Sequence, residues 1–122
     1  NEKDLGEAEA VFRKIIDIKP GDSRAYLGLA RVFMQQGQLE KAEKELNRAA
    51  AVAPDSIQIQ LALFNLYFGQ KRFDAAEGII TTLVESNPEN ADLLGTLGNF
   101  YFRRQEKDKA EAAQALRGIW SD

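Results

Sequence analysis

The sequence contains no cysteine and no histidine among its 122 residues. Without cysteine there are no disulfide bonds and no thiolate nucleophiles, and without histidine the usual general base and the commonest zinc ligand are missing. No apolar run approaches the roughly 18 residues that a membrane-spanning helix needs. The formal net charge of −3 argues against a nucleic-acid scaffold, which usually carries a basic excess. We therefore expect no enzymatic activity, no cofactor, no metal site, no nucleic-acid partner and no membrane span in this segment.

Proline is also scarce, and its positions are regular. Pro20, Pro54 and Pro88 are the only three prolines, and the two intervals between them are equal in length. Proline ends a helix because it lacks an N–H group and its ring clashes with the preceding turn. Two positions after each proline stands a residue with a short polar side chain that can cap a new helix. These residues are Asp22, Ser56 and Asn90.

The remaining sequence has apolar residues at helical spacing throughout. Two of the expected core stripes are Tyr26, Leu29, Ala30 and Phe33, and Leu94, Leu97, Gly98 and Tyr101. This pattern predicts an all-α protein with about seven helices. Their expected ranges are 4–19, 23–36, 39–53, 57–70, 73–86, 91–104 and 107–120, with short turns at Gly37–Gln38, Gln70–Arg72 and Gln105–Glu106. Connections this short make neighbouring helices antiparallel.

The 34-residue period, the helix pairs and the motif residues resemble the tetratricopeptide repeat (TPR) family. The strongest match runs from Tyr26 to Pro54 and includes Gly37 and Ala42, and a small residue recurs at Ala8, Ala76 and Ala110. The resemblance implies an α-solenoid, a right-handed superhelix of antiparallel helix pairs. The expected repeats are 1–22 (the second helix of a truncated repeat), 23–56 (the first complete repeat), 57–90 (the second) and 91–122 (the third, with a divergent second helix).

Two departures from the family pattern concern the ends of the chain. In 107–120, Gln114, Arg117 and Gly118 interrupt the expected apolar stripe, and Ala112, Leu116 and Ile119 form a rotated one. At the other end, the chain starts at Asn1 with a second helix that lacks a first-helix partner. We therefore expect a segment of a longer TPR protein. Its compartment stays open, because such repeats occur in cytoplasmic and periplasmic proteins alike.

The resemblance also implies a concave groove lined by the first helix of each repeat. In the repeat register, three columns of residues face this groove, at spacings of i, i+4 and i+7 along each helix. With two nearby arginines, the candidate peptide-binding residues are Arg24, Leu27, Arg31, Met34, Leu61, Asn65, Phe68, Asn99, Phe102 and Arg103. Asparagine amides can pair with a peptide backbone, arginines with carboxylates, and the apolar side chains with apolar partners.

Alternatives stay open for several of these positions. Asn65 and Asn99 also match the repeat consensus, and the column of Met34, Phe68 and Phe102 also fits partial burial between adjacent helices. Gly28 and Gly95 fit two interpretations. Either they leave space for a ligand backbone, or they reflect drift between repeats or close helix packing, and the second interpretation is favoured. A clamp for two carboxylates is disfavoured, because the positions that carry lysine in chaperone-binding repeats hold leucine or glycine.

The predicted function is a non-catalytic protein–protein interaction module that binds a peptide or partner protein in the groove. The alternatives are a structural spacer or oligomerisation segment and an accessory region of a larger enzyme. Apolar residues in the first and last predicted helices, such as Phe12 and Leu116, also predict self-association through exposed repeat ends.

Overall fold

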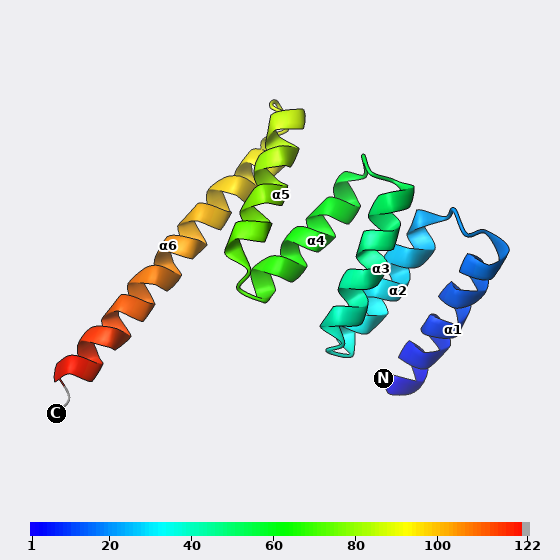
Figure 1. Ribbon diagram of the computed structural model, residues 1–122, viewed down its shortest axis with the longest axis horizontal. Coiled ribbons are helices and arrows are strands. Elements are labelled where there is room, and N and C mark those ends of the chain that lie inside the picture. The colour runs from blue at the N-terminus through cyan, green and yellow to red at the C-terminus, as the bar shows by residue number, and fades with distance from the viewer. Residues whose placement is uncertain (121–122) are drawn as a thin grey trace. The chain divides into compact units, whose positions relative to one another are not determined.

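The computed structural model describes the backbone of residues 1–120 and the side chains of residues 1–108 (Figure 1). This part of the chain forms six α-helices and contains no β-strand. The helices are α1 (Glu2–Ile18), α2 (Ser23–Gln35), α3 (Leu39–Val52), α4 (Ile57–Gly69), α5 (Phe73–Ser86) and α6 (Ala91–Trp120). The predicted all-α class is confirmed, and α1 to α5 agree with the expected ranges to within about two residues at each end.

The capped helices begin where the residues after each proline predict. The side-chain oxygens of Asp22, Ser56 and Asn90 each accept a hydrogen bond from a backbone N–H in the following turn, at 3.0, 3.3 and 3.1 Å respectively. These bonds satisfy donors that the start of a helix otherwise leaves without a partner. The Tyr26 hydroxyl also donates to the Pro20 carbonyl at 2.8 Å and so joins α2 to the loop before it.

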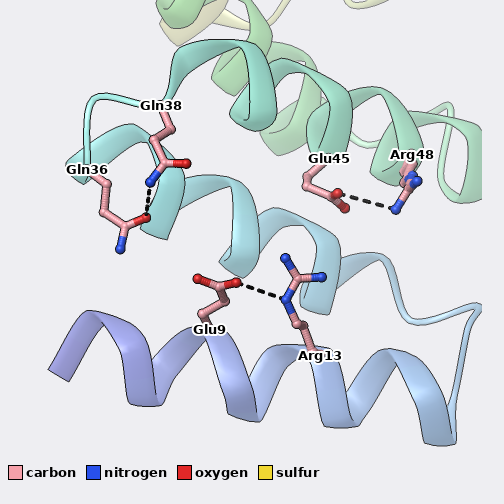
Figure 2. Close-up of polar contacts among 6 residues, drawn as sticks. All are labelled: Glu9, Arg13, Gln36, Gln38, Glu45 and Arg48. Atoms are coloured by element: carbon pink, nitrogen blue, oxygen red, sulfur yellow. Dashed lines mark hydrogen bonds and ion pairs between the residues drawn. The ribbon is translucent and has the colours of Figure 1, made fainter. Parts of the chain in front are cut away.

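The turns inside the first two repeats depend on a residue with left-handed backbone conformation. Gly37 has a φ of 74° between α2 and α3, and Lys71, at the equivalent position of the next repeat, has a φ of 63° between α4 and α5. Glycine adopts this conformation without a steric penalty, whereas a residue with a Cβ, such as Lys71, adopts it at a cost in free energy. Gln38 adds a side-chain hydrogen bond to Gln36 across the first of these turns (Figure 2).

The third turn is absent, and the expectation of a turn at Gln105–Glu106 is wrong. Instead of two helices over 91–104 and 107–120, α6 runs without interruption from Ala91 to Trp120 (Figure 1). Gln105 stands one repeat period after Lys71, and the segment around it consists of strong helix formers, with neither glycine nor proline. In the repeat register, folding back would also place Gln114 and Arg117 where α3 buries Leu46 and Ala49.

Contacts divide the chain into two compact units, and the first comprises Asn1–Lys71. Within it α1 packs on α2, α2 on α3 and α3 on α4. Leu29 and Phe33 of α2 form a buried cluster with Ala42 of α3, against which Phe12 and Ile16 of α1 pack. The Tyr67 hydroxyl of α4 donates to the Glu43 carboxylate of α3 at 3.0 Å.

One buried residue of the first unit is charged. Glu45 of α3 is 5% exposed, and its Oε2 atom has no hydrogen-bond partner. Its Oε1 atom accepts a hydrogen bond of 3.3 Å from Arg48 one turn later (Figure 2). The equivalent positions in the register are Val11 and Ile79, so the other helices of this type place an apolar side chain there.

The second unit comprises Arg72–Asp122, in which α5 packs on α6. Leu93 and Phe100 of α6 are buried, and Arg104 forms an ion pair of 3.6 Å with Glu77 of α5. The predicted core stripe of this helix was different: Leu94, Leu97, Gly98 and Tyr101. Leu97 is half-buried, but Leu94, Gly98 and Tyr101 are exposed, because the helix expected to cover them does not fold back.

The left-handed turn residues give a first testable prediction. Replacing Lys71 with glycine should raise the free energy of unfolding by about 0.5–1 kcal/mol, because the left-handed strain is relieved at a smaller cost in chain entropy. Replacing Gly37 with alanine should lower it by about 1 kcal/mol, since the φ of 74° disfavours any Cβ. Urea unfolding followed by circular dichroism measures both changes. An unchanged or lower stability for Lys71→Gly would contradict the assigned backbone conformation.

Glu45 gives a second prediction. Replacing it with valine should raise the free energy of unfolding by roughly 1 kcal/mol, because the change removes a buried carboxylate oxygen without a partner. Glu45→Gln serves as the matched control and should give a smaller gain, since it removes the charge but keeps polar atoms in the same place. Thermal unfolding of the two variants beside the parent chain compares them. If valine destabilises the protein, the carboxylate stabilises the fold after all.

Candidate peptide-binding face

The middle of the three predicted columns is exposed in both units. Arg31 of α2 and Asn65 of α4 are exposed in the first unit, and Asn99 of α6 is exposed in the second. The helices that carry these residues begin at equivalent caps, so the residues occupy the same rotational position on each helix. We call Arg31, Asn65 and Asn99 the middle column.

The column one turn earlier is not uniform. Leu27 is buried at 5% exposure, Leu61 is half-buried and Gly95 is exposed. Leu27 therefore belongs to the core of the first unit and offers no surface to a partner. The repeat register places these residues on equivalent turns, but their burial depends on the neighbouring helices.

The column one turn later is half-buried in the first unit and open in the second. Met34 packs against the cluster of Leu29, Phe33 and Ala42. The ring of Phe68 stacks on that of Phe64, with 6.1 Å between centroids and 27° between planes. Phe102, by contrast, is 64% exposed. Met34 and Phe68 thus follow the partial-burial alternative, whereas Phe102 is an aromatic side chain presented to solvent.

The arginines differ in how they are held. The Arg24 guanidinium donates to both carboxylate oxygens of Asp22, at 3.2 and 3.3 Å. This hydrogen bonding lowers the pKa of the Asp22 carboxyl and raises the pKa of Arg24. Arg24 is therefore already paired with the cap of its own helix. Arg31 and Arg103 occupy exposed positions further along α2 and α6.

The described part of the chain holds no cluster of side chains for binding a metal. There, no group of three or more His, Cys, Asp or Glu side chains is placed to hold a metal ion. Within the same residues, no helix is both long enough and apolar enough to cross a membrane. An open hollow on α3 is lined by Glu40, Glu43, Lys44, Asn47, Arg48 and Ala51. Its walls come from a single helix, so it cannot enclose a small molecule as a binding pocket does.

The two glycines inside first helices have different surroundings. A Cβ on Gly28 would collide with the Phe12 ring of α1, so this glycine allows α1 and α2 to approach closely. A Cβ on Gly95 would meet no atom within 4 Å. The close-packing interpretation is therefore confirmed for Gly28, whereas Gly95 lies on an open surface.

The sequence-based prediction missed two features: the buried charge of Glu45 and the exposed stripe of Leu94, Gly98 and Tyr101. A comparison with the equivalent positions, Val11 and Ile79, would have identified Glu45 as unusual, because both of those residues are apolar. The exposed stripe had no such signal, because its exposure follows from the uninterrupted course of α6.

These features define an α-helical repeat protein with exposed polar columns on its first helices. Two family models described as tetratricopeptide repeat match the chain, one over residues 1–66 and the other over residues 61–122. Each match covers at least half of the sequence, and the chain belongs to the tetratricopeptide repeat family. Among curated proteins, no sequence matches it significantly.

Solved structures share the fold. A thermophilic TPR protein from Thermus thermophilus matches with a TM-score of 0.75 and 26% identity, over 80% of this chain and 50% of that one. PilF from Pseudomonas aeruginosa matches with a TM-score of 0.72 and 21% identity, over 95% of this chain and 54% of that one. The type III secretion translocator chaperone SycD from Yersinia enterocolitica matches with a TM-score of 0.68 and 17% identity, over 85% of this chain and 77% of that one. The chain thus spans about half the length of the first two structures.

The glycine comparison gives a third prediction. Gly28→Ala should lower the free energy of unfolding, because the clash with Phe12 outweighs the gain of about 1 kcal/mol in helix propensity. Gly95→Ala is the matched control and should raise stability by about 0.5–1 kcal/mol, since its Cβ meets nothing. Urea unfolding of both variants measures the difference. Equal stabilisation by both would show that Phe12 does not pack on Gly28.

Proposed function

We propose that this chain is a protein-binding module that takes an extended or helical peptide on the exposed face of its first helices. Tetratricopeptide repeats are in general non-catalytic scaffolds for protein–protein interaction, and this chain belongs to that family. The observation that supports this proposal most strongly is the exposure of the middle column, with Arg31 and Asn65 in the first unit and Asn99 in the second.

The chemistry of the column supports a peptide. An asparagine side chain carries both a donor and an acceptor, so it can pair with the C=O and N–H groups of a peptide backbone whatever its sequence. Because Asn65 and Asn99 are exposed, they lose little by exchanging water for such a partner. This pairing supplies attachment without sequence specificity.

Specificity would come from the neighbouring side chains. Arg31 offers a planar guanidinium that suits a carboxylate, and Phe102 offers an exposed aromatic ring for an apolar side chain. We therefore expect a peptide bound by the first unit to prefer acidic residues, and one bound by the second unit to prefer apolar residues. Leu27 is left out of this surface because it is buried.

Two other functions fit the family. A spacer would leave the middle column in contact with water only, and an accessory region of a larger enzyme would require chemistry beyond this chain. Among the neighbours, SycD is described as a translocator chaperone, which is a protein-binding role of that protein. The proposal for this chain depends on its own exposed column.

Selection from a random peptide library displayed on phage, followed by fluorescence anisotropy with the selected peptides, tests the proposal. We expect Asn65→Ala and Arg31→Ala each to weaken binding about tenfold, the equivalent of one charge-assisted or bidentate hydrogen-bonded contact. Both positions are exposed, so thermal stability should stay close to that of the parent chain.

Lys44→Ala on α3 is the matched control, since Lys44 lies outside the middle column. It should leave peptide affinity unchanged. Peptides that lose affinity to the Lys44 variant but not to the Asn65 and Arg31 variants would place binding elsewhere. A library that yields no binding peptide would favour the spacer.

A further inference from the structure

The exposed stripe of α6 lies on a side of the helix that α5 leaves open. Leu94 and Tyr101 are each 45% exposed, and Gly98 between them is exposed as well. Phe100 is buried on the side where α5 packs, and Arg104, which lies over its ring at 5.9 Å, forms its ion pair with a carboxylate of α5. The stripe is thus an apolar surface beside an established core.

The uninterrupted course of α6 extends this stripe. Ala112, Leu116 and Ile119 follow the three stripe residues at one constant interval, which amounts to about five full turns of an α-helix. These residues are rotated away from the apolar positions of the repeat, but on the continuous backbone of α6 they stand in line with the exposed stripe. The departure from the repeat pattern therefore continues the stripe along the second half of the helix.

The continued stripe has the spacing of a coiled coil, in which core positions alternate in steps of about three and four residues. We call the positions of α6 with this spacing the heptad face. They are Leu94, Gly98, Tyr101, Gln105, Asp108, Ala112, Ala115 and Ile119. All but the two central positions hold small or apolar residues, and the central Gln105 and Asp108 are exposed.

We propose that α6 of one copy packs antiparallel on α6 of a second copy along the heptad face, so that the chain forms a symmetric dimer. The interface is isologous, because both copies use the same surface. The first half of α6 in each copy would meet the second half of α6 in the other.

The heptad face is complementary to itself in size in this orientation. An antiparallel pair centred between Glu106 and Lys107 brings three kinds of layer together. These layers are Leu94 with Ile119, Gly98 with Ala115, and Tyr101 with Ala112. The bulky aromatic ring thus meets an alanine, the glycine meets another small residue, and two large aliphatic residues meet at each end. Such matching allows two helices to pack without clashes or voids.

The two polar positions of the heptad face also meet each other. Gln105 stands opposite Asp108 of the second copy, so its amide can donate a hydrogen bond to that carboxylate. Neither polar group is then buried without a partner. A parallel pair would instead place two Asp108 carboxylates face to face. Polar residues at core positions of coiled coils fix register and orientation in this way.

The charges at one edge of the heptad face fit the same orientation. In the antiparallel pair, Arg104 of one copy faces Glu111 of the other. The Arg104 side chain is 35% exposed while it pairs with Glu77, so a second carboxylate can approach it. The complementary sizes and charges together make a second copy the occupant that fits this surface. A single helix pair forms a small interface, so the association should be weak and should grow with concentration.

Sedimentation velocity over a concentration series tests the proposal. The parent chain should shift from monomer to dimer and form nothing larger, because an isologous interface closes on itself. Leu94→Asp should raise the dimer Kd by at least about tenfold, since the charge enters the interface at both ends. Asn99→Asp is the matched control, because it adds the same charge on another side of α6, and it should dimerise like the parent.

Both positions are exposed, so circular dichroism should show unchanged helicity for the two variants. A parent chain that stays monomeric at every concentration would overturn the proposal. Equal dimerisation of Leu94→Asp and the parent chain would do the same, and so would equal weakening by the two variants.

Disulfide cross-linking tests the antiparallel orientation, because the chain has no cysteine of its own. Oxidising a mixture of Gly98→Cys and Ala115→Cys proteins should give the mixed dimer as the main product. A Cβ at Gly98 meets no atom within 4 Å, so the fold tolerates the change. Gly98→Cys alone should stay unlinked, since an antiparallel pair keeps the two copies of this position about 25 Å apart along the helix.

The control mixture replaces Gly98→Cys with Arg103→Cys, on the opposite side of α6, and should give no mixed dimer. Linkage of Gly98→Cys to itself would show a parallel pair and overturn the proposal.

Discussion

The contact between the two helices of a repeat is the interaction on which the rest of this structure depends. In the α2–α3 pair, Ala30 and Ala42 have no exposed surface, and Leu29 and Phe33 are almost fully buried beside them. Small side chains allow the two helices to approach, and the large ones fill the space along the seam. A helix of this length is marginal alone in water, so its stability comes from such a seam.

The same requirement explains how the α2–α3 pair continues into the rest of the first unit. Phe12 can approach α2 only because residue 28 is glycine, and Tyr67 joins α4 to α3 through Glu43. Each added helix covers a flank of the helix before it and presents a new one. An array of this kind is stable because successive helices cover one another's flanks.

Much of the fold could be predicted from the sequence, because its strongest signals are local: proline stops a helix by its own ring, and the capping residues start one by their own side chains. The third turn is not local. Lys71 turns the chain although it is not glycine, whereas Gln105, in the equivalent position, continues the helix. In the candidate site, periodicity likewise placed the middle column on equivalent turns, but it could not predict that Leu27 is buried while Gly95 in the same column is exposed. A register fixes where a side chain stands on its own helix, and only packing decides what lies against it.

The two sets of exposed residues on α6 lie on different sides of the helix for a geometrical reason. The column positions Gly95, Asn99 and Phe102 each follow a residue of the exposed stripe, Leu94, Gly98 and Tyr101. One step along an α-helix rotates the side chain by about 100°. The two sets therefore point in well-separated directions, so covering the exposed stripe would leave Asn99 open to a peptide. In the first unit the same arrangement already exists, since α3 covers Ala30 and Phe33 of α2 while Arg31 stays exposed. Packing on one side of a first helix thus stabilises the helix, while its opposite side stays open to a partner.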